Sequence, residues 1–214
     1  QAVLKSGDTR SFTGQVHFIA PKGVSVISDI DDTIKHSQVT EKSELLKNTF
    51  LREFSPVLGM PGLYKALADR KVAFHYVSGS PWQLYQPLEA FLSRAGFPQG
   101  TFHLKHFRLS DSSGLEILSS QQETKIEAIT PLLAAFPDRK FILIGDSGEQ
   151  DPEIYGQIAR ENADQIAGIF IRNVTAADRS DERLKKALEG VPNDRWSLFG
   201  DADEIAEKVF GLTE

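Results

Sequence analysis

The sequence contains no cysteine, no long hydrophobic run and no excess of basic residues. Without cysteine the chain can form neither a disulfide nor a thiolate metal site, and its redox compartment stays open. Its apolar runs, such as residues 141–144, are much shorter than the roughly 20 residues that cross a bilayer. Lysine and arginine total 24 against 30 aspartate and glutamate, a net charge of −6. That balance argues against a protein that binds nucleic acid through bulk positive charge.

The chain has no internal repeat, low-complexity tract or long linker, so its 214 residues predict a single domain, 1–214. Gln1 is not an initiator methionine, and a removed signal peptide is one explanation for this start. We therefore expect a soluble or peripheral membrane protein, either cytoplasmic or exported. No feature of the sequence indicates an oligomeric state.

Short apolar runs alternate with segments of helical periodicity along most of the chain. This alternation predicts an α/β fold with a doubly wound, Rossmann-like, mainly parallel sheet of about five core strands and helices on both faces. We expect strands near residues 24–30, 72–78, 102–108, 140–146 and 166–174. We divide the chain into N-terminal edge strands in 1–23, a catalytic core at 24–175 and C-terminal helices in 176–214. Within the core we expect a small insert at 34–60 that contains a short helix at 44–54. The C-terminal helices are expected near 181–190 and 201–211.

Three carboxylates follow the first buried strand within four positions. Asp29, Asp31 and Asp32 come shortly after the apolar residues of the strand, Val24, Val26 and Ile27. In an open α/β sheet, ligands bind at the carboxyl ends of the strands. An ordinary acidic turn does not explain crowded like charges beside an apolar strand, because their repulsion costs energy unless a cation offsets it. The pattern therefore favours a cation or phosphate site.

The second strand ends in a polar turn. Ser78 and Gly79 lead to Ser80-Pro81, which with Gln83 has the pattern of a capping box. A tight turn into a helix N-terminus is typical of anion sites, so we expect this turn to bind phosphoryl oxygens. The histidines show no metal-ligand spacing, and His75 is assigned to the core.

The second half of the chain supplies one base and two more acids. Lys125 lies in Thr124-Lys-Ile-Glu127, a second capping box, which predicts a helix beginning there. A lysine in a first helical turn opposes the helix dipole, so its placement favours a functional role. Asp146 ends the fourth strand, and Asp151 precedes Pro152, where an ordinary N-cap would also explain it.

This ordered set suits the hydrolysis of a phosphate monoester. Asp29 is placed to attack phosphorus and form an aspartyl-phosphate, and Asp31 to act as general acid and base. Oxygen ligands from Asp29, the Asp31 carbonyl and Asp146, with Asp151 as a further candidate, suit Mg²⁺. Ser78 and the amides after it would hold the phosphoryl oxygens, and Lys125 would offset the charge of the intermediate.

The sequence Asp29-Ile-Asp-Asp-Thr33 resembles the first motif, DxDxT, of the haloacid dehalogenase phosphohydrolases. Ser78, Lys125 and Asp146 with Asp151 stand in the order of the later motifs of that superfamily, and Asp32 occupies a position where relatives often have glycine. More narrowly, SDIDDTIK, FHYVSGSPWQLY, FHLK and FILIGDSGEQDPEIY are similar to the catalytic domain of the actin-patch-associated phosphatidate phosphatases, relatives of the lipins.

The resemblance runs from about residue 10 to 175. It implies Mg²⁺-dependent dephosphorylation of phosphatidate to diacylglycerol at a membrane surface, with Thr33 in the substrate site and no large cap domain. Two other functions stay open: hydrolysis of soluble phosphomonoesters, and phosphatidate binding without turnover. Lys105 competes with Lys125 for the third-motif role, and we favour Lys125 because it precedes the fourth strand through one helix, as the lysine of the superfamily does. Lys105 and Arg108 then become candidates for binding the lipid headgroup. Trp82, Leu58 and Met60 could contact acyl chains, but core packing is the role we favour for each.

Overall fold

A single parallel sheet organises the computed structural model, which describes residues 7, 14, 16–36, 54–106, 114–176 and 178–213, without the side chains of 114–121. Within these residues the sheet has six strands in the order β3-β2-β1-β4-β5-β6. The strands are β1 (Gly23–Ser28), β2 (Ala73–Pro81), β3 (Thr101–Lys105), β4 (Arg139–Asp146), β5 (Ile166–Arg172) and β6 (Trp196–Phe199). The chain order reverses beside β1, which places a topological switch point between β1 and β4.

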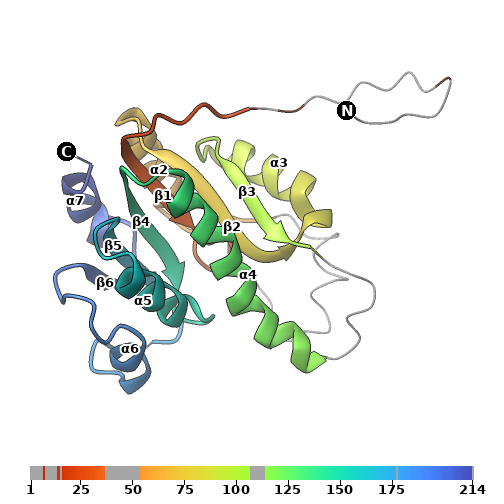
Figure 1. Cartoon of the computed structure of the whole chain (residues 1–214). Helices are drawn as coiled ribbons and strands as arrows, with labels where there is room; N and C mark the ends of the chain where they lie inside the picture. The colour runs from red at the N-terminus through yellow and green to blue at the C-terminus, as the bar shows by residue number, and fades with distance from the viewer. Residues whose placement is uncertain are drawn as a thin grey trace.

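Helices cover both faces of the sheet (Figure 1). They are α2 (Met60–Asp69), the short 3₁₀ helix η1 (Trp82–Leu84), α3 (Tyr85–Ala95), α4 (Gly114–Ala135), α5 (Asp151–Glu161), α6 (Glu182–Ala187) and α7 (Asp203–Gly211). Side chains of α2, α3 and α7 pack in one apolar cluster, and those of α4 and α5 pack in a second cluster on the opposite face. The predicted doubly wound α/β fold is therefore confirmed.

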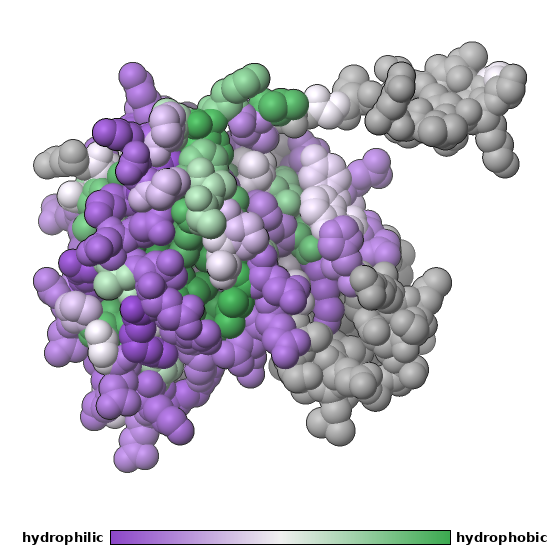
Figure 2. All heavy atoms as spheres, in the orientation of Figure 1, coloured by the Kyte–Doolittle hydropathy of each residue, from purple (hydrophilic) through white to green (hydrophobic). Residues whose placement is uncertain are grey.

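The sheet is buried on both faces because its central strands are apolar at almost every position. Val26 faces the cluster with α2 and α3, and its neighbour Ile27 faces the cluster with α4 and α5. Ile142 and Leu143 divide in the same way. On the face that carries α4 and α5, hydrophobic side chains form a narrow band between hydrophilic surfaces (Figure 2). None of the helices in the described ranges is both long and apolar enough to cross a membrane.

The C-terminal part of the chain differs from the prediction by one strand. It contains β6 between α6 and α7, where only helices were expected. The run Trp196–Phe199 has four residues, and so short an apolar run has no decisive period of its own. Pairing with β5 makes it a strand.

The described residues before Gly23 contain no strand, so the N-terminal edge strands predicted within 1–23 are wrong for residues 16–22, while most of the remainder lies outside the described residues. The physical reason is that β1 is a central strand, paired on both sides by β2 and β4. No edge of β1 is open to an additional strand. The carbonyls of Ala20 and Lys22 instead accept hydrogen bonds from the Arg139 side chain. The helix predicted at 44–54 also lies outside the described residues, except for Phe54.

Both predicted capping boxes are wrong. Helix α4 begins at Gly114, so Thr124 and Lys125 lie in its interior and not in a first turn. Strand β2 continues through Ser80 to Pro81, and η1 separates it from α3. The local pattern was satisfied in both places, but longer-range pairing and helix propagation decided where each element begins.

Candidate active site

The polar residues singled out by the sequence meet at the carboxyl edge of the sheet. Asp29 follows β1 directly, Ser78 lies near the end of β2, and Asp146 ends β4. Asp29, Ser78, Asp146, Asp151 and Lys125 are all buried. Five polar side chains withdrawn from water at one sheet edge require partners, and those partners define the site.

Three aspartates form the centre of the site. One carboxylate oxygen from each of Asp29, Asp146 and Asp151 lies within 4.8 Å of the other two. Among the described residues, Asp29 Oδ1 and Asp146 Oδ2 are buried and accept no hydrogen bond. Buried carboxylate oxygens without hydrogen bonds are costly unless a cation compensates them. Lys125 Nζ lies close to Asp29 Oδ1 and compensates it in part, whereas Asp146 Oδ2 has no such neighbour in the described part of the chain, so the oxygen-only donor set fits a hard divalent cation.

Lys125 supplies positive charge within the cluster. Its Nζ lies 2.9 Å from Asp29 Oδ1, 2.5 Å from Asp151 Oδ1 and 3.1 Å from Glu149 Oε2, with the side chain 1% exposed. Because Lys125 lies in the middle of α4, its side chain extends toward the carboxyl edge of the sheet and is buried there, out of contact with solvent. One ammonium faces three acids here, and Asp146 adds a fourth nearby, so the site keeps an excess of negative charge.

Burial and charge shift the pKa values of these groups. Burial raises the pKa of Asp29 well above its usual range, and Lys125 opposes that shift. Burial also raises the pKa of Asp146 to about 7, with Asp151 and Glu149 adding to the rise. For Lys125, burial acts to lower the pKa, but the carboxylates of Asp151 and Asp29 outweigh it and the pKa is raised. Perturbed groups gathered in one place are typical of functional sites.

The loop after β4 holds Asp146 in one orientation. Asp146 Oδ1 accepts hydrogen bonds from the amides of Gly148 (2.6 Å) and Glu149 (3.1 Å). The other oxygen, Oδ2, then faces the cluster without a partner. Asp151 folds back and accepts from the Asp146 amide at 3.1 Å, and a Cβ at Gly145 would meet Asp151 Oδ2 at 2.3 Å. Both oxygens of Asp151 are thus engaged, so it has less capacity for a cation than Asp29 and Asp146.

Asp31 lies beside the cluster and points to a different set of partners. Its Oδ2 accepts hydrogen bonds from the hydroxyls of Ser78 (3.2 Å) and Ser80 (3.0 Å). Its Oδ1 lies 2.6 Å from Lys35 Nζ. The Ser80 amide donates to Ser78 Oγ at 3.0 Å, so in this structure a hydrogen bond within the turn engages that amide. The two aspartates of the first motif therefore have separate surroundings.

Thr33 was expected in the substrate site. Its hydroxyl donates to Asp29 Oδ2 at 3.1 Å, and the residue is fully buried. The hydrogen bond leaves Oδ1 as the oxygen of Asp29 without a hydrogen bond. Thr33 thus fixes the orientation of the Asp29 carboxylate.

Asp32 has the left-handed backbone conformation, with φ of 52°. Glycine adopts this conformation freely and aspartate tolerates it better than most residues, which explains why relatives often have glycine here. Arg172 Nη1 donates to the Asp32 carbonyl at 2.7 Å and holds the turn. Asp32 therefore shapes the loop that presents Asp29 and Asp31.

Two residues at the site were missed by sequence reasoning. Lys35 follows Asp31 by four residues and pairs with it, and Glu149 lies between the two acids of the last motif and contacts Lys125. Both stand inside motifs already recognised, so proximity along the chain was the available signal. Their charge alone would not have distinguished them from solvated residues.

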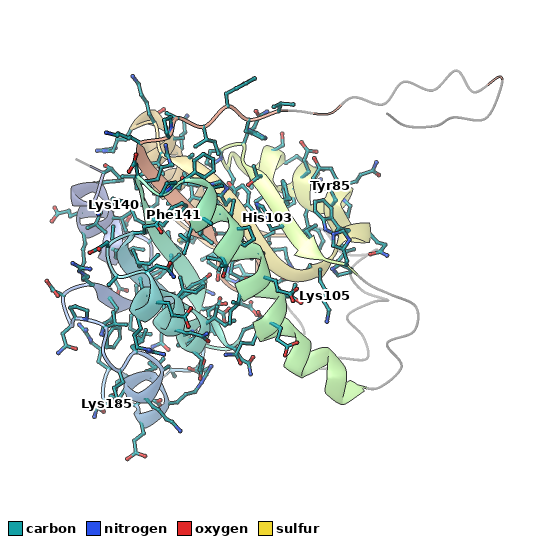
Figure 3. The ribbon with its side chains drawn as sticks, in the orientation of Figure 1. Tyr85, His103, Lys105, Lys140, Phe141 and Lys185 are labelled. Carbon is teal, nitrogen blue, oxygen red and sulfur yellow. The ribbon has the colours of Figure 1, made fainter. Side chains whose placement is uncertain are left out.

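The remaining candidates lie farther from the cluster or outside the described residues. Lys105 ends β3 and pairs in register with Pro81, at the site end of the sheet (Figure 3). Arg108 lies outside the described residues. Met60 is core, Leu58 is 84% exposed, and Trp82 packs near Tyr85, with ring centroids 5.8 Å apart.

Residues 24–173 match the protein family described as the catalytic domain of phosphatidate phosphatase APP1. The chain belongs to this family. Phosphatidate phosphatase APP1 of Saccharomyces cerevisiae is 40% identical to it over 169 residues, which cover 77% of this chain and 28% of the yeast protein. An uncharacterized protein of Schizosaccharomyces pombe is 32% identical over 171 residues, covering 77% of this chain and 27% of that protein. The chain thus spans little more than a quarter of the length of these two relatives.

Among solved structures, a phosphoserine phosphatase in its apo form superposes with a TM-score of 0.50 at 12% identity, covering 87% of this chain and 98% of that chain. At this identity the likeness concerns the fold alone. It agrees with the doubly wound parallel sheet of this chain, and no cap domain is present among the described residues.

Proposed function

We propose that this APP1-family chain is a Mg²⁺-dependent phosphatidate phosphatase, which hydrolyses phosphatidate to diacylglycerol and phosphate. The observation that carries the proposal is the buried cluster of Asp29, Asp146 and Asp151 with Lys125, in which two carboxylate oxygens accept no hydrogen bond. Family membership supports the substrate, since the yeast relative is a phosphatidate phosphatase.

Asp29 and Asp146 would hold Mg²⁺, with the Asp31 carbonyl and Asp151 as further candidates. When bound, the cation neutralises charge on the phosphoryl oxygens and on the carboxylates around it. The donor set fits because all its ligands are oxygens and because the carboxylates around Lys125 outnumber its one positive charge.

Asp29 performs the first chemical step. One of its oxygens attacks phosphorus, the bond from phosphorus to the diacylglycerol oxygen breaks, and an aspartyl-phosphate forms. Asp31 donates a proton to the leaving oxygen, so that diacylglycerol departs as a neutral alcohol. Thr33 keeps the Asp29 carboxylate oriented, and Lys125 compensates charge beside it.

Water completes the cycle. Asp31, now ionised, takes a proton from a water molecule as that water attacks the phosphorus of the aspartyl-phosphate. The bond from phosphorus to Asp29 breaks, which releases inorganic phosphate and restores both carboxyl groups. Ser78 and Ser80, which hold Asp31 in the structure, would donate to phosphoryl oxygens when substrate is present.

The substrate is expected at a membrane surface, with Lys105 and Arg108 as candidate headgroup contacts. A direct test measures phosphate release from phosphatidate in mixed micelles and from soluble phosphomonoesters, each with Mg²⁺ or with EDTA. We expect turnover of phosphatidate that EDTA abolishes. A preference for soluble esters would assign the site to that substrate class, and tight phosphatidate binding without phosphate release would make the chain a binding module.

A further inference from the structure

One side chain from beyond the family-matched residues contacts the loop that carries Asp146. Arg183 lies on α6, ten residues after the match ends at residue 173. Its Nη1 donates to the Ser147 carbonyl at 2.7 Å, and its Nη2 donates to the Glu149 carbonyl. Helix α6 packs against α5 at the end of the sheet toward which β4 points (Figure 1).

The guanidinium of Arg183 is itself fixed by Glu153 in the first turn of α5. Arg183 Nε lies 2.7 Å from Glu153 Oε1, and Nη2 lies 2.9 Å from Oε2. The two side chains are 42% and 33% exposed, so the ion pair by itself adds little stability. Its effect is geometric, because a planar fork held at one carboxylate presents its other donors in a fixed direction.

The peptide group between Ser147 and Gly148 connects Arg183 to Asp146. Its carbonyl accepts from Arg183, and its N–H donates to Asp146 Oδ1 at 2.6 Å. A trans peptide is planar, with its C=O and N–H on opposite sides, so holding the carbonyl also sets the direction of the N–H. That N–H makes the shorter of the two amide hydrogen bonds to Oδ1, the other coming from Glu149, and together they leave Oδ2 of Asp146 without a hydrogen bond.

We propose that Arg183 is a positioning residue for the cation site, which orients Asp146 through the Ser147–Gly148 peptide. The proposal rests on the Mg²⁺ site of the proposed function. It also extends the functional unit into the C-terminal segment, which the family match does not include.

The sign of the effect separates this role from simple electrostatics. Arg183 carries a positive charge that interacts with Asp146. If charge alone mattered, replacing Arg183 with a neutral residue would strengthen binding of a cation nearby. If Arg183 positions Asp146, the same replacement weakens that binding, because Asp146 loses its fixed orientation. Outer contacts of this kind typically change metal affinity about 10- to 100-fold.

The test compares Arg183→Gln with Arg160→Gln. Arg160 is a matched control because it also joins α5 to the α6 region through two backbone carbonyls, donating to Ala187 (3.0 Å) and Glu189 (2.8 Å). Among the described residues, neither of these hydrogen bonds involves the 146–149 loop. For each variant, Mg²⁺ binding is measured by calorimetry without substrate, the folded fraction by thermal melting in EDTA, and the Mg²⁺ dependence of phosphate release by steady-state kinetics.

We expect Arg183→Gln to weaken Mg²⁺ binding about 10-fold or more, with turnover recovering at high Mg²⁺. Arg160→Gln should leave Mg²⁺ affinity unchanged. Unchanged or tighter Mg²⁺ binding in Arg183→Gln overturns the proposal, as does equal weakening in both variants. If Arg183→Gln does not fold, Arg183→Lys, which keeps the charge without the fork, is measured by the same criteria. Absence of Mg²⁺ binding in the wild type would instead contradict the proposed function.

Discussion

Charged side chains are buried at both ends of the sheet, but they differ in how fully hydrogen bonds within the protein satisfy them. At the amino end, Arg139 is buried, and its guanidinium donates to Ser25 Oγ and to the carbonyls of Ala20, Lys22 and Val24. At the carboxyl end, Asp29 and Asp146 each retain a buried oxygen that accepts no hydrogen bond.

The difference separates a structural charge from a functional one. Arg139 has hydrogen-bond partners on all three of its nitrogens, and these tie the segment before β1 to β4. A charge satisfied in this way by protein groups stabilises the fold and does not need a ligand. At the other end, as far as the structure describes the chain, Asp29 Oδ1 has only the Lys125 ammonium beside it as a partner and Asp146 Oδ2 accepts no hydrogen bond, which fits a site that a cation and a phosphate group complete.

The largest effect on turnover is expected from a substitution at the carboxyl end of the sheet. Asp29→Asn should lower phosphatidate turnover by about 10⁴-fold, because an amide cannot serve as the nucleophile. The free energy of unfolding without metal should stay equal or rise, since a buried negative charge is removed. Steady-state phosphate release and urea unfolding in EDTA measure the two effects. Activity at the wild-type level would rule out the covalent mechanism.

The second prediction distinguishes the two lysines. Lys125→Ala should lower turnover by roughly 10²- to 10³-fold, because it removes the ammonium that lies 2.9 Å from Asp29 Oδ1. Lys105→Ala serves as the comparison and should change turnover by less than about 10-fold, since its site is at the end of β3. The reverse ranking in phosphate-release assays would assign the third motif to Lys105.

At the amino end of the sheet, where Arg139 has hydrogen-bond partners, we expect a substitution to lower stability with little change in turnover. Arg139→Met should lower the free energy of unfolding by about 3 kcal/mol, because Ser25 and three carbonyls lose their donor. The activity of the folded fraction should be retained. Urea unfolding and specific activity per folded molecule provide the measurement. Loss of turnover at full stability would show that the two ends are not independent.

The smallest expected effect depends on pH. His75 lies near Arg139, and burial lowers its pKa from 6.5 to about 4, with His103 and Arg139 adding to the shift. Between these values the unfolded chain binds more protons than the folded chain, so stability falls as the pH falls from about 6.5 towards 4. At pH 5 the loss is about 2 kcal/mol.

His75→Phe should reduce this pH dependence, because the aromatic side chain fits beside Phe136 and Phe141 and does not titrate. Urea unfolding at pH 7.5, 6 and 5 gives the slopes of the two proteins. An equal slope in wild type and His75→Phe would assign the acid sensitivity to other groups.

The sequence determined much of the site because its chemistry follows short motifs. The apolar run before Asp29, the acid at the end of β4 and the order of Ser78, Lys125 and Asp146 were sufficient to predict an α/β fold and a phosphohydrolase site at one sheet edge. These features depend on local burial and on the parallel connection of strands, both of which leave a pattern in sequence.

Only the tertiary structure decided how these residues divide their tasks. The contacts of Lys125 with Asp29 and Asp151, and the contact of Arg183 with the 147–149 loop, join elements far apart in the chain. A sequence pattern shows that a side chain is charged, but not which way it extends once helices and strands are packed. The packing of helices and strands determines which hydrogen-bond partners each buried charged group has.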